Sequence, residues 1–352
     1  MGKARVLIDA WLDRNLPVLP DPKLDRAARI ALVRQYGDFS TAWLSAVQPG
    51  LRYFGGPAGY LAYGMKMGQV IALGDPVAAP DAKVKLLADF LALAPCSMFV
   101  EISVSTALAL QTMGRQVALF GFDTELELTP ETFSGSMMKS IRYRESWNKT
   151  QGFSIKEIKS PDEACALAGQ FNEAWRKTRV VGRREMGFIN RQLDFGQHDD
   201  PVRRFFLFDK DGAPEAFIVF EPMFRHGRLS GYVTALKRRK PTASAYAEMG
   251  LTKSCADIFQ AEQIEVLSLG LAPLAGWDNH QAGHDFNQNR LFCRLLEMIG
   301  TARISNGRLF NFRNQAAFKR RFHGAETPRY IAHKPGFPVV ATLAFARLTR
   351  MI

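Results

Sequence analysis

The chain has little that would build a metal site or a disulfide framework. It contains no Cys-x-x-Cys pair, and its four cysteines are widely spaced: Cys96, Cys165, Cys255 and Cys293. Such sparse thiols are typical of reduced, buried side chains in a reducing compartment. His280 and His284 are four residues apart and would share one helix face, but their surroundings are loop-like and contain no obvious third ligand. We therefore predict neither a disulfide nor a bound metal.

Long hydrophobic runs are also missing. Stretches without a charged residue, such as residues 102–114, fall short of the roughly 20 residues that a membrane helix needs. The N-terminus, MGKARVLIDAWLDRN, lacks the apolar core and cleavage site of a secretory signal, and Val6 breaks the myristoylation pattern. These absences predict a cytoplasmic protein without an integral membrane segment. A length of 352 residues with 47% hydrophobic side chains is typical of two folded domains.

Positive charge is abundant and concentrated near the C-terminus. The chain has 46 Lys/Arg against 34 Asp/Glu, a net charge of +12. Residues 301–352 contain ten Lys/Arg and a single acid, Glu326. Within them, the block LFNFRNQAAFKRRFHGAETPRY at 309–330 combines aromatic, amide and basic side chains. This charge distribution indicates a polyanionic partner, either a nucleic acid or an anionic lipid surface.

The pattern of strands and helices predicts two tandem α+β domains rather than one doubly wound sheet. After a helix at 23–36, the first half has strands at 60–63, 70–73, 98–104 and 116–120, a turn at 74–76, and helices at 81–94 and 106–113. The second half has strands at 205–208, 216–220, 228–236 and 264–269, and helices at 242–260 and 287–299. We place the first domain at 1–135, a linker helix at 136–152, the second domain at 153–335 and a tail at 336–352.

Two segments outside these domains have alternative interpretations. The linker, SMMKSIRYRESWNKTQ, is either a solvated helix or a basic rail for nucleic-acid phosphates, formed by Lys139, Arg142, Arg144 and Lys149. The tail at 337–352 is apolar with two arginines. It either lies on an anionic bilayer as an interfacial helix or packs against the second domain and closes it.

Five segments in order resemble one known family. They are IALGDPV (71–77), MMKSIRYRESWNKTQG (137–152), REMGF (184–188), LGLAPLAG (269–276) and NFRNQAAFKRRFHGAETPRY (311–330). Over roughly residues 50–335 the chain is similar to the cytosolic catalytic domain of bacterial lysyl- and alanyl-phosphatidylglycerol synthases of the multiple-peptide-resistance type. The resemblance implies two GNAT-type acyltransferase domains joined by a basic helix.

The resemblance also implies an activity. The family enzymes transfer an aminoacyl group from a charged tRNA to a lipid hydroxyl, and their domain follows a membrane-spanning flippase region that this sequence lacks. We therefore expect an aminoacyl-tRNA donor. The acceptor is phosphatidylglycerol, another lipid, or a small molecule with a hydroxyl or amine, reached by peripheral contact with the inner face of the membrane. No cofactor is expected because the donor ester is already activated, and no DNA partner is expected.

Aminoacyl transfer needs a proton acceptor, donors for the tetrahedral oxyanion and a partner for the α-ammonium. We predict Glu185, Glu326 and Lys319 as catalytic residues. Glu185 is otherwise a salt-bridge residue, and Glu326 otherwise pairs with Arg329. The predicted substrate-binding residues, chosen by resemblance, by charge and by the turn at 269–276, are Gly270, Pro273, Asp278, Arg238, Asn311, Phe312, Arg313, Arg321 and Arg329.

In the basic block, the aromatic and the basic side chains are predicted to have different roles on one helix. Phe318 and Phe322 are four residues apart and would anchor the helix, while Lys319 and Arg321 would face outward toward an anionic donor or headgroup. Trp175 reads as a core residue. The family usually has Asp-Leu-Met-Arg where this chain begins Thr234-Ala235, so the lost acid predicts altered recognition of the amino acid or acceptor.

Two other functions compete with this one. An acyl-CoA-dependent enzyme would use an Arg/Gln-x-x-Gly-x-Gly/Ala loop at a helix N-terminus to hold the pyrophosphate. The windows at 111–116 and 184–189 both lack the final small residue, which argues against CoA. The remaining alternative is a non-catalytic module that binds tRNA or a membrane without turnover.

Overall fold

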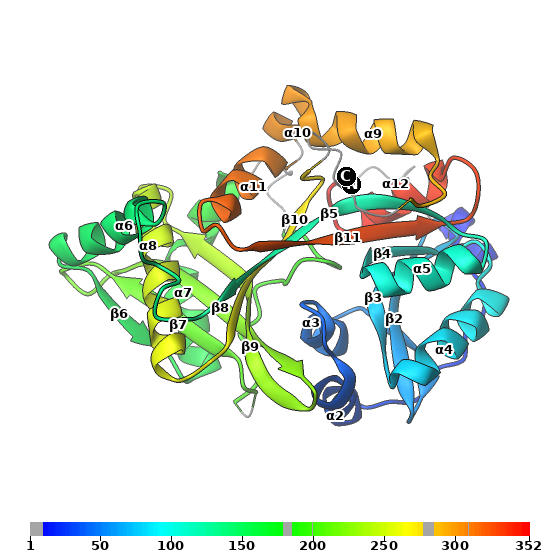
Figure 1. Ribbon diagram of the computed structural model, residues 1–352, viewed down its shortest axis with the longest axis horizontal. Helices are drawn as coiled ribbons and strands as arrows, with labels where there is room; N and C mark the ends of the chain where they lie inside the picture. The colour runs from blue at the N-terminus through cyan, green and yellow to red at the C-terminus, as the bar shows by residue number, and fades with distance from the viewer. Residues whose placement is uncertain (1–9, 179–184, 199, 277–284, 309) are drawn as a thin grey trace.

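All strands of the computed structural model, which describes residues 10–178, 185–198, 200–276, 285–308 and 310–352, belong to one sheet. The eleven strands are ordered β1-β2-β3-β4-β11-β5-β10-β9-β8-β7-β6. Figure 1 shows β6 to β9 at one side of the molecule and β2 to β4 at the other, with helices packed against the sheet. Within the described part of the chain, no helix is long and apolar enough to cross a membrane.

The first half is a three-stranded meander followed by a parallel crossover. Strand β3 pairs antiparallel with β2 and parallel with β4, and helix α4 connects β3 to β4. The elements are η1 (Asp13–Asn15), α2 (Arg26–Tyr36), α3 (Ala42–Val47), β1 (Arg52–Gly56), β2 (Gly59–Lys66), β3 (Gln69–Ala78), α4 (Pro80–Leu93), β4 (Met98–Ile102), α5 (Val104–Thr112) and β5 (Gln116–Glu127).

The second half repeats this arrangement. Strands β7, β8 and β9 form the meander, and helix α8 connects β9 to the parallel strand β10. Its elements are β6 (Ser154–Glu157), α7 (Pro161–Lys177), β7 (Arg203–Phe208), β8 (Pro214–Arg225), β9 (Arg228–Arg239), α8 (Ala245–Ala261), β10 (Val266–Pro273), α9 (Arg290–Thr301), α10 (Arg303–Arg308), α11 (Phe312–Arg320), β11 (Ala325–His333) and α12 (Val339–Leu348). The repeated order confirms the predicted α+β class with two GNAT-like units, joined by α6 (Lys139–Thr150).

Strand β11 ties the two halves together. It lies between β4 and β5, although it follows the second half in the chain, and β5 in turn pairs with β10. The sequence division assigns β11 to the 153–335 domain, and that division remains a prediction. Because the halves share one sheet, residues of β5, β10 and β11 that are far apart in sequence become neighbours.

The parallel strand pairs at the centre of each unit separate after a short ladder. Strands β9 and β10 pair from Gly231 opposite Val266 to Val233 opposite Ser268, and the pairing stops there although both strands continue. A bulge in β10 lies just beyond, where Gly270 adopts a φ of +72° that favours glycine. The predicted turn at residues 74–76 is wrong, because these residues form a similar irregularity inside β3.

The C-terminal tail covers the first unit. Helix α12 packs on β2 and β3 and buries Ala341 and Ala344. The prediction that the tail closes the second domain is therefore wrong. Its outer face stays apolar, since Val339, Val340 and Leu343 are exposed. The proposed role as an interfacial helix stays a prediction.

The linker helix is docked closely against the second unit. A Cβ atom on Gly250 of α8 would lie 2.4 Å from Asn148 Nδ2 and 2.7 Å from the Arg144 carbonyl oxygen of α6. We expect Gly250→Ala to lower the free energy of unfolding by about 1–3 kcal/mol, measured by urea denaturation, because close-packed helices cannot absorb the methyl group. The control is Gly169→Ala in α7, where the new Cβ meets open space and helix propensity predicts a small gain. Equal effects of the two changes would contradict close docking.

Candidate active site

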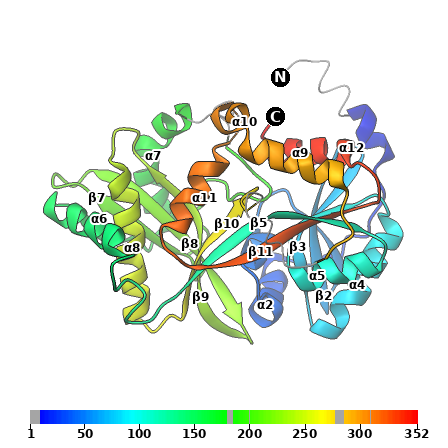
Figure 2. The same ribbon diagram turned by 45° about the horizontal axis from the view of Figure 1, so that its top comes forward.

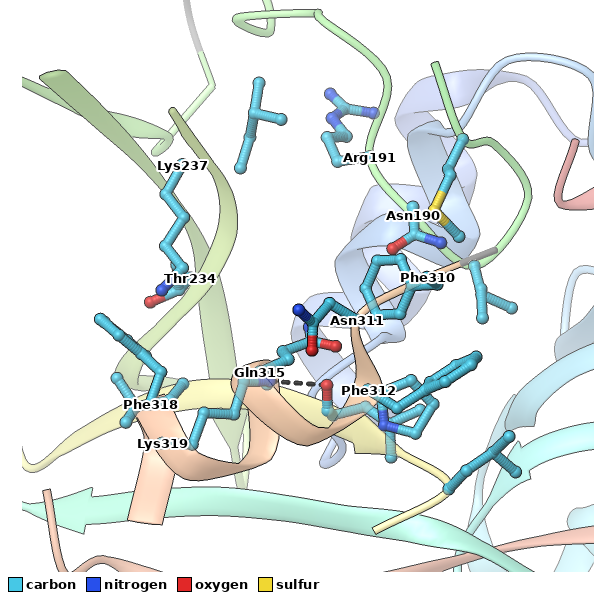
Figure 3. Close-up of a pocket in the computed structure, with 18 of the residues that line it drawn as sticks. Asn190, Arg191, Thr234, Lys237, Phe310, Asn311, Phe312, Gln315, Phe318 and Lys319 are labelled. Atoms are coloured by element: carbon cyan, nitrogen blue, oxygen red, sulfur yellow. Dashed lines mark hydrogen bonds between the residues drawn. The ribbon is translucent and has the colours of Figure 1, made fainter. Parts of the chain in front are cut away.

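A cavity of about 1030 Å³ lies between the two halves of the sheet, a volume at the upper end for small-molecule sites. Figure 3 shows Thr234 and Lys237 of β9 on one side of it, α11 below and the loop carrying Asn190 and Arg191 opposite. The lining differs by region. Most of the cations come from β9 and the residues after it and from α11 and its C-terminal end, and one comes from the opposite loop: Lys237, Arg238, Arg239, Lys240, Lys319, Arg321 and Arg191.

The other region of the cavity is apolar. Its side chains belong to one core cluster that joins the first unit to α9 and α12: Leu44, Met98, Phe120, Phe292, Leu296, Ile331 and Phe345. Helices α9 and α12, which lie next to each other in the view of Figure 2, both contribute side chains to this cluster. The cavity can therefore hold a molecule with one anionic and one hydrocarbon part, or two molecules of these kinds.

Lys319 is buried in the cavity wall, so the prediction that it faces outward is wrong. Helix α11 turns Phe312, Ala316 and Lys319 toward the protein, while Phe318 is only half-buried. Nζ of Lys319 donates a 2.6 Å hydrogen bond to the Leu271 carbonyl oxygen, the dashed line in Figure 3. Burial, reinforced by the charge of Lys237, lowers the pKa of Lys319 to about 7. A large fraction of this amine is therefore neutral at physiological pH.

The predicted aromatic anchor is confirmed. Phe322 is fully buried just beyond α11, and its ring centroid lies 5.4 Å from that of Phe318. Arg321, beside it, is exposed and lines the cavity, as predicted for a residue facing an anionic group. Of Lys319 and Arg321, both predicted to face outward, Arg321 does so, whereas Lys319 lies on the buried face of the helix.

A buried ion pair joins β11 to β5 next to Ser40, a residue of the cavity lining. Arg329 of β11 donates from Nε to Asp123 Oδ2 of β5 at 2.7 Å, and Ser40 Oγ donates to the same oxygen at 2.6 Å. Burial opposes the charge of Arg329, but the charges of Asp123, Asp75 and Glu101 together outweigh it and raise the pKa of Arg329. The predicted Glu326–Arg329 pair is wrong, since Glu326 pairs with Arg320 at 3.2 Å. Among the described residues that line the cavity, neither Glu326 nor Arg329 appears.

Glu185 and Arg238 form the predicted alternative, a salt bridge, on the cavity wall. Arg238 NH1 lies 3.1 Å from Glu185 Oε1, and its guanidinium lies 4.2 Å from the centre of the Trp175 ring. Burial opposes ionisation of Glu185, but the Leu193 amide and Arg238 prevail and lower its pKa. Trp175 is half-buried and lines the cavity, so its assignment to the core is wrong.

The other predicted site residues fall into three groups. Gly270, Pro273, Asn311 and Phe312 line the cavity. Exposed Arg313 does not, whereas Asp278, His280, His284 and Arg184 lie outside the described residues. The described residues contain no cluster of His, Cys, Asp and Glu suited to a metal.

The linker cations lie away from the cavity, on α6. Arg142 donates to the carbonyl oxygens of Phe133 and Gly135, Arg144 lies over the Tyr246 ring, and Lys149 pairs with Glu145 at 2.6 Å. Lys139 is exposed. Their role as a phosphate rail stays a prediction.

Several cavity residues escaped the sequence analysis. Among them are buried polar atoms without a hydrogen-bond partner in the described part of the chain: Thr41 Oγ1, Glu101 Oε2, Asn190 Nδ2 and Gln315 Oε1. Thr234 Oγ1, at the position already noted for its lost acid, is a further such atom. Such orphaned groups gather where a ligand completes the hydrogen bonding. Glu101 carried a usable signal, because it is the one charged residue in the apolar strand MFVEI.

Comparison with known proteins finds one matching family model and solved structures with a similar fold. Residues 30–333 match the family model described as phosphatidylglycerol lysyltransferase, C-terminal. Among solved structures, it is similar to L-PGS from Bacillus licheniformis, with a TM-score of 0.72 and 17% identity over 94% of this chain and 98% of that one. It is also similar to the C-terminal domain of a proposed lysylphosphatidylglycerol synthetase from Agrobacterium fabrum, with a TM-score of 0.70 and 20% identity over 92% and 95% of the two chains.

The fold consists of two GNAT-like units that share one sheet. Because the family model covers most of its length, the chain belongs to the phosphatidylglycerol lysyltransferase C-terminal family. A protein of Corynebacterium glutamicum is 23% identical over 344 residues, which are 94% of this chain and 42% of that protein. The chain therefore spans less than half the length of that relative.

Proposed function

We propose that this protein transfers an aminoacyl group from a charged tRNA to a hydroxyl of phosphatidylglycerol or a related lipid. The observation that carries the proposal is the buried amine of Lys319 in a cavity that has both cationic and apolar lining. The cations suit the phosphates of a tRNA acceptor end, and the apolar region suits the hydrocarbon of a lipid. Family membership supports an aminoacyl group as the transferred group and phosphatidylglycerol as the acceptor, whereas the tRNA donor rests on the sequence resemblance.

Lys319 would act as the general base. Its neutral amine takes the proton of the acceptor hydroxyl as the oxygen attacks the ester carbonyl, forming a tetrahedral intermediate. The intermediate collapses by breaking the bond to the ribose oxygen of the tRNA, and the Lys319 ammonium returns the proton to that oxygen. Base and acid are thus the same group, and no net proton is gained or lost. A pKa of about 7 suits both steps, since it lies near the working pH.

The structure gives less support to a CoA donor. A pyrophosphate loop needs amides at a helix N-terminus, whereas residues 111–116 run from the end of α5 into β5. The departure at Thr234 lies in the cavity beside the cations of β9. We therefore propose that the amino acid differs from that of family members with an acid there.

The test is transfer from a panel of radiolabelled aminoacyl-tRNAs to total lipid extract, separated by thin-layer chromatography. We expect label in one lipid spot, from one or a few tRNAs, and none with Lys319→Met. Lys334→Met, at an exposed lysine outside the cavity, is the matched control and should transfer normally. Label from acyl-CoA but from no tRNA would overturn the proposal, and binding of tRNA without any transfer would favour the non-catalytic module.

A further inference from the structure

Among the described residues, four carboxylates line the cavity, and three of them are already engaged. Glu185 pairs with Arg238 at 3.1 Å, Glu221 with Arg191 at 2.9 Å, and Glu248 with Lys237 at 2.7 Å. The fourth, Glu101, has no ion pair or hydrogen bond with any described residue. Its side chain is 3% exposed, and Oε2 is buried without a partner. The cavity therefore contains one carboxylate that is free to receive a ligand group.

The backbone at Glu101 is strained in a way that serves this placement. Glu101 has a φ of +62°, a left-handed conformation that a non-glycine residue adopts only at an energetic cost. The pairing of β4 with β11 shifts at this point, between Tyr330 and Ile331. Its neighbours Val100 and Ile102 are fully buried. A strained acid within an apolar strand is poor for stability, which indicates selection for a role at the site.

The surrounding charges leave Glu101 without a dedicated counter-ion. Burial and the nearby Asp123 raise its pKa well above the usual value, and Arg329 and Lys319 only partly oppose this. Arg329 is bound to Asp123, and the amine of Lys319 donates to Leu271. A ligand cation placed here would supply the missing partner for the carboxylate.

The geometry points to Glu101 as the group that receives the α-ammonium of the aminoacyl donor. This assignment rests on the proposed function. Every aminoacyl ester carries an ammonium two bonds from the reacting carbonyl, and the cavity cations would repel it. Glu101 and Lys319 both line this cavity, so an ammonium held at Glu101 would bring the ester carbonyl toward the amine that activates the acceptor.

The test compares two donors, an aminoacyl-tRNA and the same tRNA with the α-amine acetylated, on wild-type protein and Glu101→Gln. We expect the wild type to prefer the free amine, and Glu101→Gln to lower kcat/KM for that donor by about 10- to 100-fold while leaving the acetylated donor unchanged. Glu297→Gln, on the exposed face of α9, is the control and should match the wild type. Equal losses with both donors, or no loss with either, would overturn the assignment.

A binding measurement keeps the inference testable independently of turnover. A hydrolysis-resistant donor, with an amide in place of the ester, should bind Glu101→Gln about 10- to 100-fold more weakly than wild type, and acetylating its amine should abolish the difference. Thermal unfolding of the variant verifies that it folds. If the wild type transfers from neither donor but binds the amide analogue through Glu101, the proposed reaction fails and the ammonium site stands.

Discussion

Lys319→Met should reduce kcat for aminoacyl transfer by about 10²- to 10⁴-fold, the usual contribution of a general base. In the wild type, kcat should rise with pH up to about 7 and then level off, because only the neutral amine can accept the hydroxyl proton. Lys319→Arg should also be nearly inactive, since a guanidinium stays protonated throughout this range. Steady-state kinetics between pH 5.5 and 9, a window set by roughly two units about that pKa, would measure both. If Lys319→Met stays active and its kcat still rises with pH up to about 7, another group is the base.

The same substitution should make the protein more stable. Lys319 has a pKa of about 7 in the folded state against 10.5 normally, so the unfolded chain binds the proton more tightly. The resulting penalty on folding is fully present below pH 7 and fades as the pH rises from 7 toward 10.5. Lys319→Met should therefore raise the free energy of unfolding by about 1–4 kcal/mol at pH 6, and by much less at pH 9. Urea denaturation at both pH values would show this, with Lys334→Met as a control of unchanged stability.

The local elements could largely be predicted because they depend on short-range patterns. Apolar spacing and Pro95 indicated the helix at 81–94, which is α4, and the turn after β7 followed from Asp209 and Gly212. The position of β11 could not be predicted in this way. Its pairing with β5 brings Arg329 to Asp123 across 206 residues of chain, and no local pattern reports such a contact. The expected Glu326–Arg329 pair was the nearest local alternative, and it was wrong for this reason.

The cavity residues were predicted less well than the fold. The resemblance identified the right segment, α11 with its flanks, but not the phase of its helix. Phe312, Ala316 and Lys319 share the buried face, whereas hydrophobicity alone places a lysine on the outer one. Glu101 was missed although the sequence shows it as a lone acid in an apolar strand, because its left-handed backbone and its lack of partners are visible only in the structure.

Among the ion pairs of the described structure, we expect the buried pair of Asp123 and Arg329 to cause the largest loss of folding stability when one of its two partners is replaced. Arg329→Met would leave Asp123, which has 0% exposure, with a buried charge and, among the described residues, a single side-chain hydrogen bond, from Ser40. We expect a loss of about 3–5 kcal/mol in the free energy of unfolding, and a similar loss for Asp123→Leu. The double variant should recover much of this loss, because no unpaired charge remains.

Urea unfolding of the two single variants and the double variant forms a double-mutant cycle that measures the coupling. The exposed pair of Lys85 and Asp89, at 2.6 Å on α4, is the control and should contribute less than about 1 kcal/mol. Because β11 joins the halves through this pair, the single variants should also lose transfer activity. The reason is that β11, β5 and the adjoining cavity residue Ser40 would be displaced. Additive losses in the cycle would show that Asp123 and Arg329 act independently, contrary to the role of the pair in holding β11 beside β5.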